Sequence, residues 1–136
     1  MEAVNWRDFE AQEPALASEV EKCLSGEVSF LGTVRPDGYP RVHPVGPLGV
    51  RDGSLVVSMF PTSPKGHDIR RAGHYALHGG IASGVEVLVT GTATETTTSE
   101  SDRTSGYVAF ELLVSEVLVT KYEDHGLTPI RTRWKP

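Results

Sequence analysis

The chain has 136 residues, of which 38% are hydrophobic and 23% charged, with a formal net charge of −5 and a pI near 5.5. This length predicts a single domain spanning residues 1–136, and the acidic balance argues against a general nucleic-acid binder. No apolar run approaches the roughly 18 residues of a membrane helix. The N-terminus lacks the apolar region of a signal peptide, and the lone cysteine excludes an intrachain disulfide. We therefore expect a cytoplasmic protein with no membrane or nucleic-acid partner.

The first 26 residues are predicted to be helical. Pro14 suits the start of a helix and Gly26 its end. Four apolar side chains recur at helical spacing: Leu16, Val20, Cys23 and Leu24. Cys23 lies on this apolar stripe, where a buried free cysteine is more common than a catalytic thiolate.

After Gly26 the pattern changes to short β-branched runs separated by turn signals. Strands are predicted over residues 30–34, 39–45, 54–60, 75–78, 85–93, 107–113, 117–122 and 130–134. Pro36-Asp37-Gly38 and Arg51-Asp52-Gly53 are hairpin signals, and Asp124-His125-Gly126 indicates a further turn. The polar tract over residues 96–102 fits a solvated loop or a short helical cap. Many short strands with turn punctuation predict a small barrel or sandwich.

The segment from Thr62 to Gly66 has the composition of a phosphate site. It places two hydroxyls, an ammonium and a glycine just before a predicted helical turn over residues 68–71, which carries Arg70 and Arg71. Free N–H groups at a helix start attract anions, and Lys65 adds a positive charge. A polar surface loop with solvated basic residues has a similar composition, and the spacing of a Walker A loop is missing.

A second candidate segment is the strand from Arg41 to Val45. Arg41, His43 and Val45 face one way, and Val42 and Pro44 face the other. Because Pro44 cannot donate a ladder hydrogen bond, this strand should lie at an edge or kink, where a ligand can approach the backbone. Ser58 and Met59 end another predicted strand and could form the floor under the same ligand. The alternative for His43 is an exposed histidine without a role.

The remaining polar side chains have competing interpretations. His74 and His78 share a strand face, but no third ligand stands at a recognisable spacing, so no metal site is predicted. Arg131 and Arg133 also share a face, where they could bind a phosphate, bind a partner carboxylate or remain solvated. Trp134, on the opposite face, could pack the end of the barrel.

The order of these features resembles the pyridoxamine-phosphate-oxidase-like superfamily of split barrels that bind FMN or F420. The resembling features are the Asp-Gly turn, the R-V-x-P-V strand, the S-x-K-x-x-x-I-R-R run and the final strand ending in Trp; together they cover residues 16–136. The resemblance implies a mainly β (α+β) fold. This would be a six- or seven-stranded antiparallel split β-barrel with an N-terminal helix and short peripheral helices. It also implies a homodimer with two cofactor sites at the subunit interface.

The resemblance further implies roles for individual residues. Arg41, Val42, His43 and Pro44 would line the isoalloxazine ring, with Ser58 and Met59 beside them. Ser63 and Lys65 would hold the cofactor phosphate, with Thr62 as a helper. Arg133 and Trp134 would reach toward the partner subunit's site.

The implied activity is an FMN- or F420-dependent oxidoreductase that acts on a small-molecule substrate by hydride transfer, with the electrons carried by the cofactor. No catalytic residue is assigned, although His43 is the best candidate for a proton donor near the ring. The alternative is a non-enzymatic flavin- or haem-binding carrier or sensor on the same fold.

The chain departs from the family pattern at two positions. Its end reads Arg131-Thr132-Arg133-Trp134, without the Arg-x-His signature of true pyridoxamine-phosphate oxidases, so oxidation of pyridoxamine phosphate is not expected. It also has Asp68 where many relatives carry Asn. A carboxylate pointing into a phosphate site would weaken anion binding.

Overall fold

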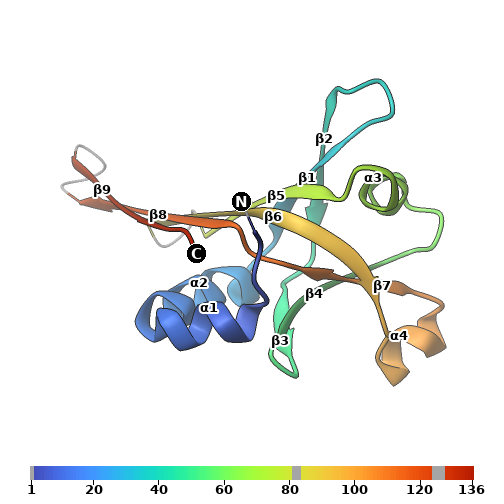
Figure 1. The fold of residues 1–136 in the computed structure, drawn as a ribbon, viewed down its shortest axis with the longest axis horizontal. Coiled ribbons are helices and arrows are strands. Elements are labelled where there is room, and N and C mark those ends of the chain that lie inside the picture. The colour runs from blue at the N-terminus through green and yellow to red at the C-terminus, as the bar shows by residue number, and fades with distance from the viewer. Residues whose placement is uncertain (1, 81–83, 124–127) are drawn as a thin grey trace.

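The computed structural model describes residues 2–80, 84–123 and 128–136 (Figure 1). These ranges contain four helices: α1 (Trp6–Gln12), α2 (Pro14–Gly26), α3 (Pro64–Ala72) and α4 (Glu100–Ser105). They also contain nine strands: β1 (Ser29–Val34), β2 (Pro40–Val45), β3 (Gly49–Arg51), β4 (Ser54–Met59), β5 (His74–Gly79), β6 (Val85–Thr96), β7 (Val108–Leu112), β8 (Glu116–Glu123) and β9 (Thr128–Trp134). The predicted turn at residues 124–126 lies outside the described residues.

Strand β6 is shared between two sheets. Its first part pairs with β5 and β8, and its last part, from Ala93 to Thr96, pairs with β7. The hydrogen-bonded order is β2-β1-β5-β6-β7-β4-β3, and β9 is attached through β8 (Figure 1). Every strand pair in the described ranges is antiparallel, which confirms the predicted antiparallel split-barrel α+β fold.

Two details of the predicted barrel need correction. The described chain has nine strands rather than the six or seven that the resemblance implied. Eight of them correspond to the ranges predicted from the sequence, and the three-residue β3 was not anticipated. Strands β8 and β9 extend as an arm (Figure 1). The sheet is also not closed, since β2, β3 and β9 each pair with one strand among the described residues. The edge position of β2 agrees with the expectation from Pro44.

The N-terminal segment forms two helices instead of the single one predicted. Asn5 caps α1, with its side chain accepting a hydrogen bond from the Asp8 amide at 2.8 Å. The break comes at Glu13 because a residue before proline is driven out of the helical region, and Pro14 then begins α2. In the described ranges, no helix combines the length and hydropathy that crossing a bilayer requires.

The hydrophobic core lies where the helices pack on the sheets. Trp6 and Phe9 of α1 are fully buried, and α2 contributes Ala17, Val20 and Leu24. Trp134, at the end of β9, reaches the same cluster, with its ring centroid 4.7 Å from that of Phe9. The first helices therefore join the C-terminal strand to the barrel.

The tight turns follow their sequence signals. Arg51 pairs with Ser54 across a two-residue loop, and both loop residues, Asp52 and Gly53, have positive φ angles of 51° and 79°. This is the backbone geometry that an Asp-Gly hairpin turn favours. The tract expected to be a loop or short helical cap contains the end of β6, a short loop and then α4, which is capped by Ser99 accepting from the Asp102 amide.

Candidate functional site

Four of the predicted cofactor residues line one hollow of about 360 Å³. It lies where the ends of β2 and β4 approach the start of α3, and it is bordered by Pro44, Val45, Gly46, Ser58, Met59, Phe60, Lys65 and Tyr107. Pro44, Ser58, Met59 and Lys65 come from the predicted set and from three separate elements. Phe60 and Tyr107 were not singled out from the sequence, although they are the last residue of the predicted strand 54–60 and the first residue of the predicted strand 107–113.

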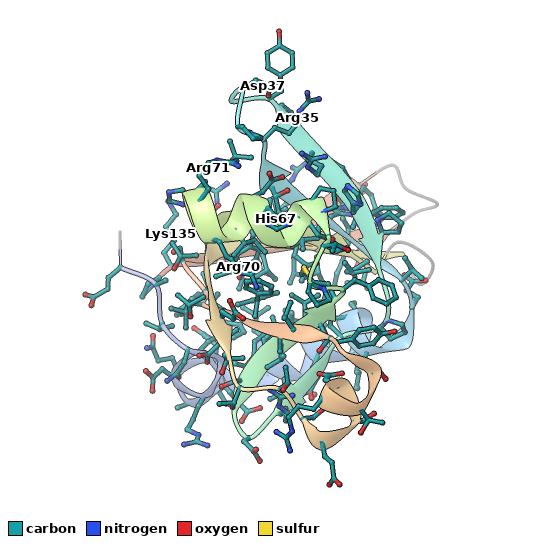
Figure 2. The ribbon with its side chains drawn as sticks, turned by 90° about the vertical axis from the view of Figure 1, so that its right-hand side faces the viewer. Arg35, Asp37, His67, Arg70, Arg71 and Lys135 are labelled. Atoms are coloured by element: carbon teal, nitrogen blue, oxygen red, sulfur yellow. The ribbon has the colours of Figure 1, made fainter. Side chains whose placement is uncertain are left out.

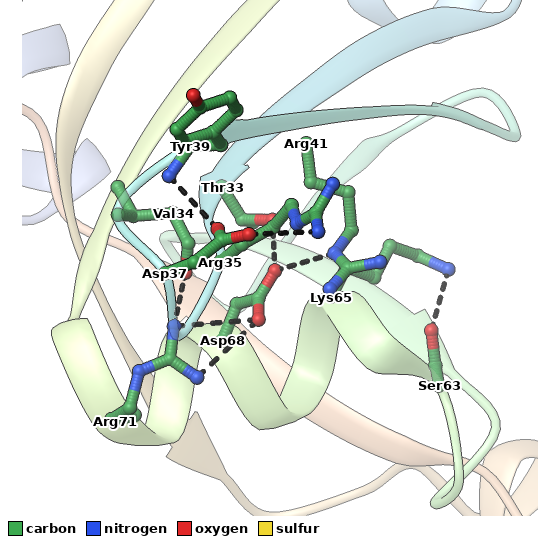
Figure 3. Close-up of polar contacts among 10 residues, drawn as sticks. All are labelled: Thr33, Val34, Arg35, Asp37, Tyr39, Arg41, Ser63, Lys65, Asp68 and Arg71. Atoms are coloured by element: carbon green, nitrogen blue, oxygen red, sulfur yellow. Dashed lines mark hydrogen bonds and ion pairs between the residues drawn. The ribbon is translucent and has the colours of Figure 1, made fainter.

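Lys65 is the charged group in the lining of this hollow. Its Nζ donates a hydrogen bond to Ser63 Oγ at 2.9 Å, so the predicted phosphate pair is brought together (Figure 3). Partial burial lowers the pKa of Lys65 from its ordinary value. Thr62, in the turn before Ser63, is exposed.

The helix that carries Lys65 begins earlier than predicted. Pro64 starts α3, so Lys65 and Gly66 lie in its first turn rather than in a preceding loop, because proline is well suited to the first helical position. The amides of Gly66 and His67 already donate to the Ser63 carbonyl, at 3.1 and 3.3 Å. These two amides are thus engaged within the chain, which leaves the ammonium of Lys65 as the main candidate group for contact with an anion.

Asp68 forms a buried ionic cluster one turn further along α3. The side chain is 2% exposed, and its Oδ2 accepts hydrogen bonds from Arg41 Nε at 2.7 Å and Thr33 Oγ1 at 2.8 Å. Arg71 approaches Oδ1 at 3.4 Å and also donates to the carbonyl of Val34 (Figure 3). Burial raises the pKa of Asp68, but hydrogen bonds from Arg41 and Thr33 and the Arg41 charge outweigh it, leaving the pKa below its usual value.

This cluster determines where Arg41 and its strand lie. Arg41 and His43 face the protein and are half-buried, whereas Val42 and Pro44 are exposed on the opposite face of β2, so the predicted alternation is confirmed. In the described chain Arg41 is bound to Asp68 and does not border the hollow.

Figure 2 shows Arg70 and Arg71 on α3, and Arg35 and Asp37 at the tip of the β1–β2 hairpin.

Ser58, in the lining of the hollow, is tied to the short helix α4. Its Oγ donates to Asp102 Oδ2 at 2.5 Å, across 44 residues of sequence. Arg51 lies 3.9 Å from the same carboxylate oxygen and donates to the carbonyl of Thr97 at 2.7 Å. The contact between α4 and β4 therefore borders the site, which the sequence did not indicate.

The C-terminal candidates lie away from the hollow within the chain. Trp134 is buried against Phe9, in agreement with the alternative that it packs the barrel end. Arg133 has a side chain 60% exposed and lies 3.9 Å from Glu116. Neither residue borders the 360 Å³ hollow.

Two further side chains, His78 and Cys23, were weighed from the sequence as a metal ligand and a reactive thiol. His78 lies 2.9 Å from Glu86, and no cluster of three metal-ligating side chains occurs in the part of the chain that the structure describes. Cys23 is half-buried; burial raises the pKa of its thiol, and the nearby charges of Glu19 and Glu27 raise it further. A raised pKa disfavours the thiolate, which is the reactive form of cysteine.

A larger hollow of about 550 Å³ lies near both ends of the chain. Its border includes three carboxylate side chains, those of Glu2, Asp8 and Glu111. Their negative charge is unfavourable for a phosphate-bearing ligand. The smaller hollow beside Lys65 is thus the better candidate for an anionic cofactor.

Two antiparallel sheets that share the long strand β6 define a split-barrel protein, and a lysine-bearing hollow lies beside its edge strand β2. The chain belongs to the pyridoxamine 5'-phosphate oxidase family, whose family model matches residues 16–117. A comparison with curated proteins found no match.

Solved structures with the same fold include proteins of several different kinds. A NimC/NimA family protein from Clostridium acetobutylicum is 14% identical, with 86% of this chain and 92% of that chain covered and a TM-score of 0.64. PhzG from Burkholderia lata 383, solved with tetrahydrophenazine-1-carboxylic acid, is 14% identical, with 96% and 93% covered and a TM-score of 0.61. A haem-binding protein from Mycobacterium smegmatis is 15% identical, with 85% and 57% covered and a TM-score of 0.61. At these sequence identities, the likeness shows that the fold is shared and nothing further.

Proposed function

We propose that the chain is an oxidoreductase that binds FMN, or the deazaflavin F420, in the hollow beside Lys65. The observation that carries this proposal is the Lys65–Ser63 pair at the start of α3, next to a concave surface lined by Pro44, Ser58 and Met59. An ammonium and a hydroxyl are suitable donors to a phosphate, and charge-assisted contacts of this kind are strong. The bound flavin would supply the electron transfer, and the protein would bind and orient it.

The proposal assigns a supporting role to the Asp68 cluster. Because the Asp68 carboxylate is engaged by Arg41, Thr33 and Arg71, it is directed away from Lys65 and leaves the lysine charge available for a ligand. The same contacts hold β2 against α3, and so hold Pro44 at the edge of the hollow. Arg41 would thus act indirectly, by positioning the strand.

We further propose that a second copy completes the site. Strand register aligns one row of residues across the outer face of the sheet: Pro44, Phe30, His78, Leu88, Leu118 and Arg133. Phe30 is 45% exposed, and Val42 on the same face is 66% exposed. We propose a two-fold axis that lies in the contact plane and crosses this row at its middle, so that the Arg133 end of one copy meets the Pro44 end of the other.

A carrier that holds flavin or haem without catalysis is the second candidate. Two polar side chains of the hollow, Ser58 and Lys65, are already hydrogen-bonded within the chain, to Asp102 and Ser63. Polar groups that are engaged in this way can bind a ligand without taking part in a reaction, so the hollow fits a carrier as well as an enzyme. Turnover of bound FMN with a reductant and a panel of oxidised small molecules separates the two candidates.

The phosphate site is tested by titrating FMN and riboflavin into wild type and Lys65→Ala. Loss of a charge-assisted contact worth roughly 1.5–3 kcal/mol should weaken FMN binding by about 10- to 150-fold. Riboflavin lacks the phosphate and should bind almost unchanged. Lys22→Ala, which removes an exposed lysine of α2, is the matched control and should leave both affinities intact. Equal losses for the two ligands, or no loss, would remove Lys65 from the phosphate site.

A further inference from the structure

Phe60 and Tyr107 form an aromatic wall on the border of the hollow. Phe60 follows β4 and Tyr107 precedes β7, and these two strands pair directly through Met59 and Val108. Their ring centroids are 5.0 Å apart at an interplanar angle of 84°, an edge-to-face contact. Phe60 is nevertheless 62% exposed. Large aromatic side chains held at the surface beside a concave site are typical of ligand recognition.

Asp102 links this wall to the polar floor of the hollow. Its carboxylate accepts the hydrogen bond from Ser58 Oγ at 2.5 Å, and its backbone carbonyl accepts from the Tyr107 amide at 2.8 Å. Its own amide donates to Ser99 Oγ at 3.1 Å, which caps α4. One residue of α4 thus fixes both Ser58 and the backbone of Tyr107, so the position of the wall depends on α4 remaining docked on β4.

We infer that Phe60 and Tyr107 are specificity-determining residues that select a ligand carrying a flat, unsaturated ring system, and that Asp102 is their positioning residue. This inference rests on the proposed function, because it describes the same hollow. The rest of the border is largely apolar, with Pro44, Val45 and Met59 offering surface to the face or edge of a ring. Lys65 takes the anionic part of the ligand, and the wall takes its ring, so the two parts are recognised by separate side chains.

The test uses two probes. Riboflavin has the ring but no phosphate. Inorganic phosphate has no ring, and its affinity is measured by competition with FMN. Phe60→Ala and Tyr107→Leu should weaken riboflavin and FMN by similar factors, roughly 5- to 100-fold for the loss of one stacking partner. The affinity for phosphate should not change. Lys65→Ala should weaken inorganic phosphate and FMN but leave riboflavin almost unchanged. Tyr39→Ala removes another exposed aromatic ring, at the hairpin tip, and is the matched control.

The positioning role of Asp102 needs a readout that general stability would not move. Asp102→Ala should weaken riboflavin binding and raise the fluorescence of bound FMN, because a displaced Tyr107 quenches the ring less. Asp102→Asn retains an acceptor for Ser58 and should restore most of both signals. Thermal unfolding of Phe60→Ala should match wild type, since the side chain is mostly exposed.

The outcomes separate this inference from the proposed function. If riboflavin fails to bind wild type, or binds the wall variants as tightly as wild type, the aromatic wall is not a recognition element. If riboflavin depends on the wall but Lys65→Ala affects neither FMN nor phosphate, the wall stands and the phosphate site falls. If Asp102→Asn is as defective as Asp102→Ala, the Ser58 contact does not position the wall.

Discussion

Arg41 and Asp68 meet across 27 residues of sequence, with Arg41 Nε donating to Asp68 Oδ2 at 2.7 Å. The contact joins edge strand β2 to helix α3, and Thr33 and Arg71 complete it from β1 and α3 (Figure 3). The carboxylate that departs from the family pattern therefore serves to hold the strand that borders the candidate site. The effect of the Asp68 charge on the candidate site depends on the three side chains that bind it, and not on its distance from Lys65 in the sequence.

Removing the Asp68 carboxylate should destabilise the fold. Asp68→Ala leaves Thr33, Arg41 and Arg71 without their shared acceptor, which we expect to lower the free energy of unfolding by about 2–4 kcal/mol, since Arg41 is partly solvated. Asp68→Asn keeps an acceptor and should lose less. Urea denaturation measures both. Glu95→Ala, at an exposed ion pair with Arg70, should change stability little. Equal stability of Asp68→Ala and wild type would show that the cluster is energetically neutral.

The same carboxylate should make stability pH-dependent in acid. The folded pKa of Asp68 is depressed below its unfolded value near 3.9, so the unfolded state binds the proton more readily. Its stabilising contribution is complete above about pH 4 and is lost as pH falls through the folded pKa. The stability difference between wild type and Asp68→Asn, followed by urea denaturation from neutral pH downward, should shrink in that window. A difference that stays constant or grows in acid would contradict this assignment.

Gly91 should tolerate no side chain. It lies on β6 between the residues paired with β8 and those paired with β7, and a Cβ placed there would be 1.9 Å from the Leu113 carbonyl oxygen. Because that oxygen belongs to backbone, Gly91→Ala should cost at least the roughly 1–3 kcal/mol typical of overpacking. Gly49→Ala in β3, where a Cβ meets nothing within 4 Å, is the control. Thermal unfolding of both variants measures the cost: Gly91→Ala should unfold at a lower temperature than Gly49→Ala. Equal unfolding temperatures would show that the backbone at Leu113 moves aside to admit the methyl group.

Self-association through the outer sheet face should be sensitive to charge at Val42. Val42 is 66% exposed in the single chain, so Val42→Glu should leave folding intact. Burying a carboxylate in a two-fold contact is costly, and we expect sedimentation at micromolar concentration to shift from dimer toward monomer. Ala11→Glu, on the exposed side of α1, adds the same charge elsewhere. A wild-type monomer that binds FMN tightly would reject the shared site.

If the second copy contributes to the cofactor site, the same substitution should weaken FMN binding in proportion to dimer loss. Raising the protein concentration should then restore the affinity of Val42→Glu by mass action. Affinity that is independent of protein concentration would place the whole site within one chain.

The local elements were largely predictable because their signals are local. Alternation along Arg41 to Val45 indicated the strand and its faces, Pro44 indicated an edge, and the Asp52-Gly53 pair indicated its tight turn. The sequence also indicated Lys65, Ser63, Pro44, Ser58 and Met59 as candidates. Proline restricts itself and the residue before it, which is why the helix boundaries at Glu13 and Ser63 were open to prediction, although both were missed.

What only the tertiary structure decided is which of these candidates meet. The pairing of Asp68 with Arg41, the docking of Asp102 on Ser58 and the burial of Trp134 against Phe9 each join residues from separate elements. Hydrophobic periodicity reports which face of an element is buried, but not which other element buries it. Those choices depend on the crossing of β6 between two sheets, a long-range arrangement set by the packing of the whole chain.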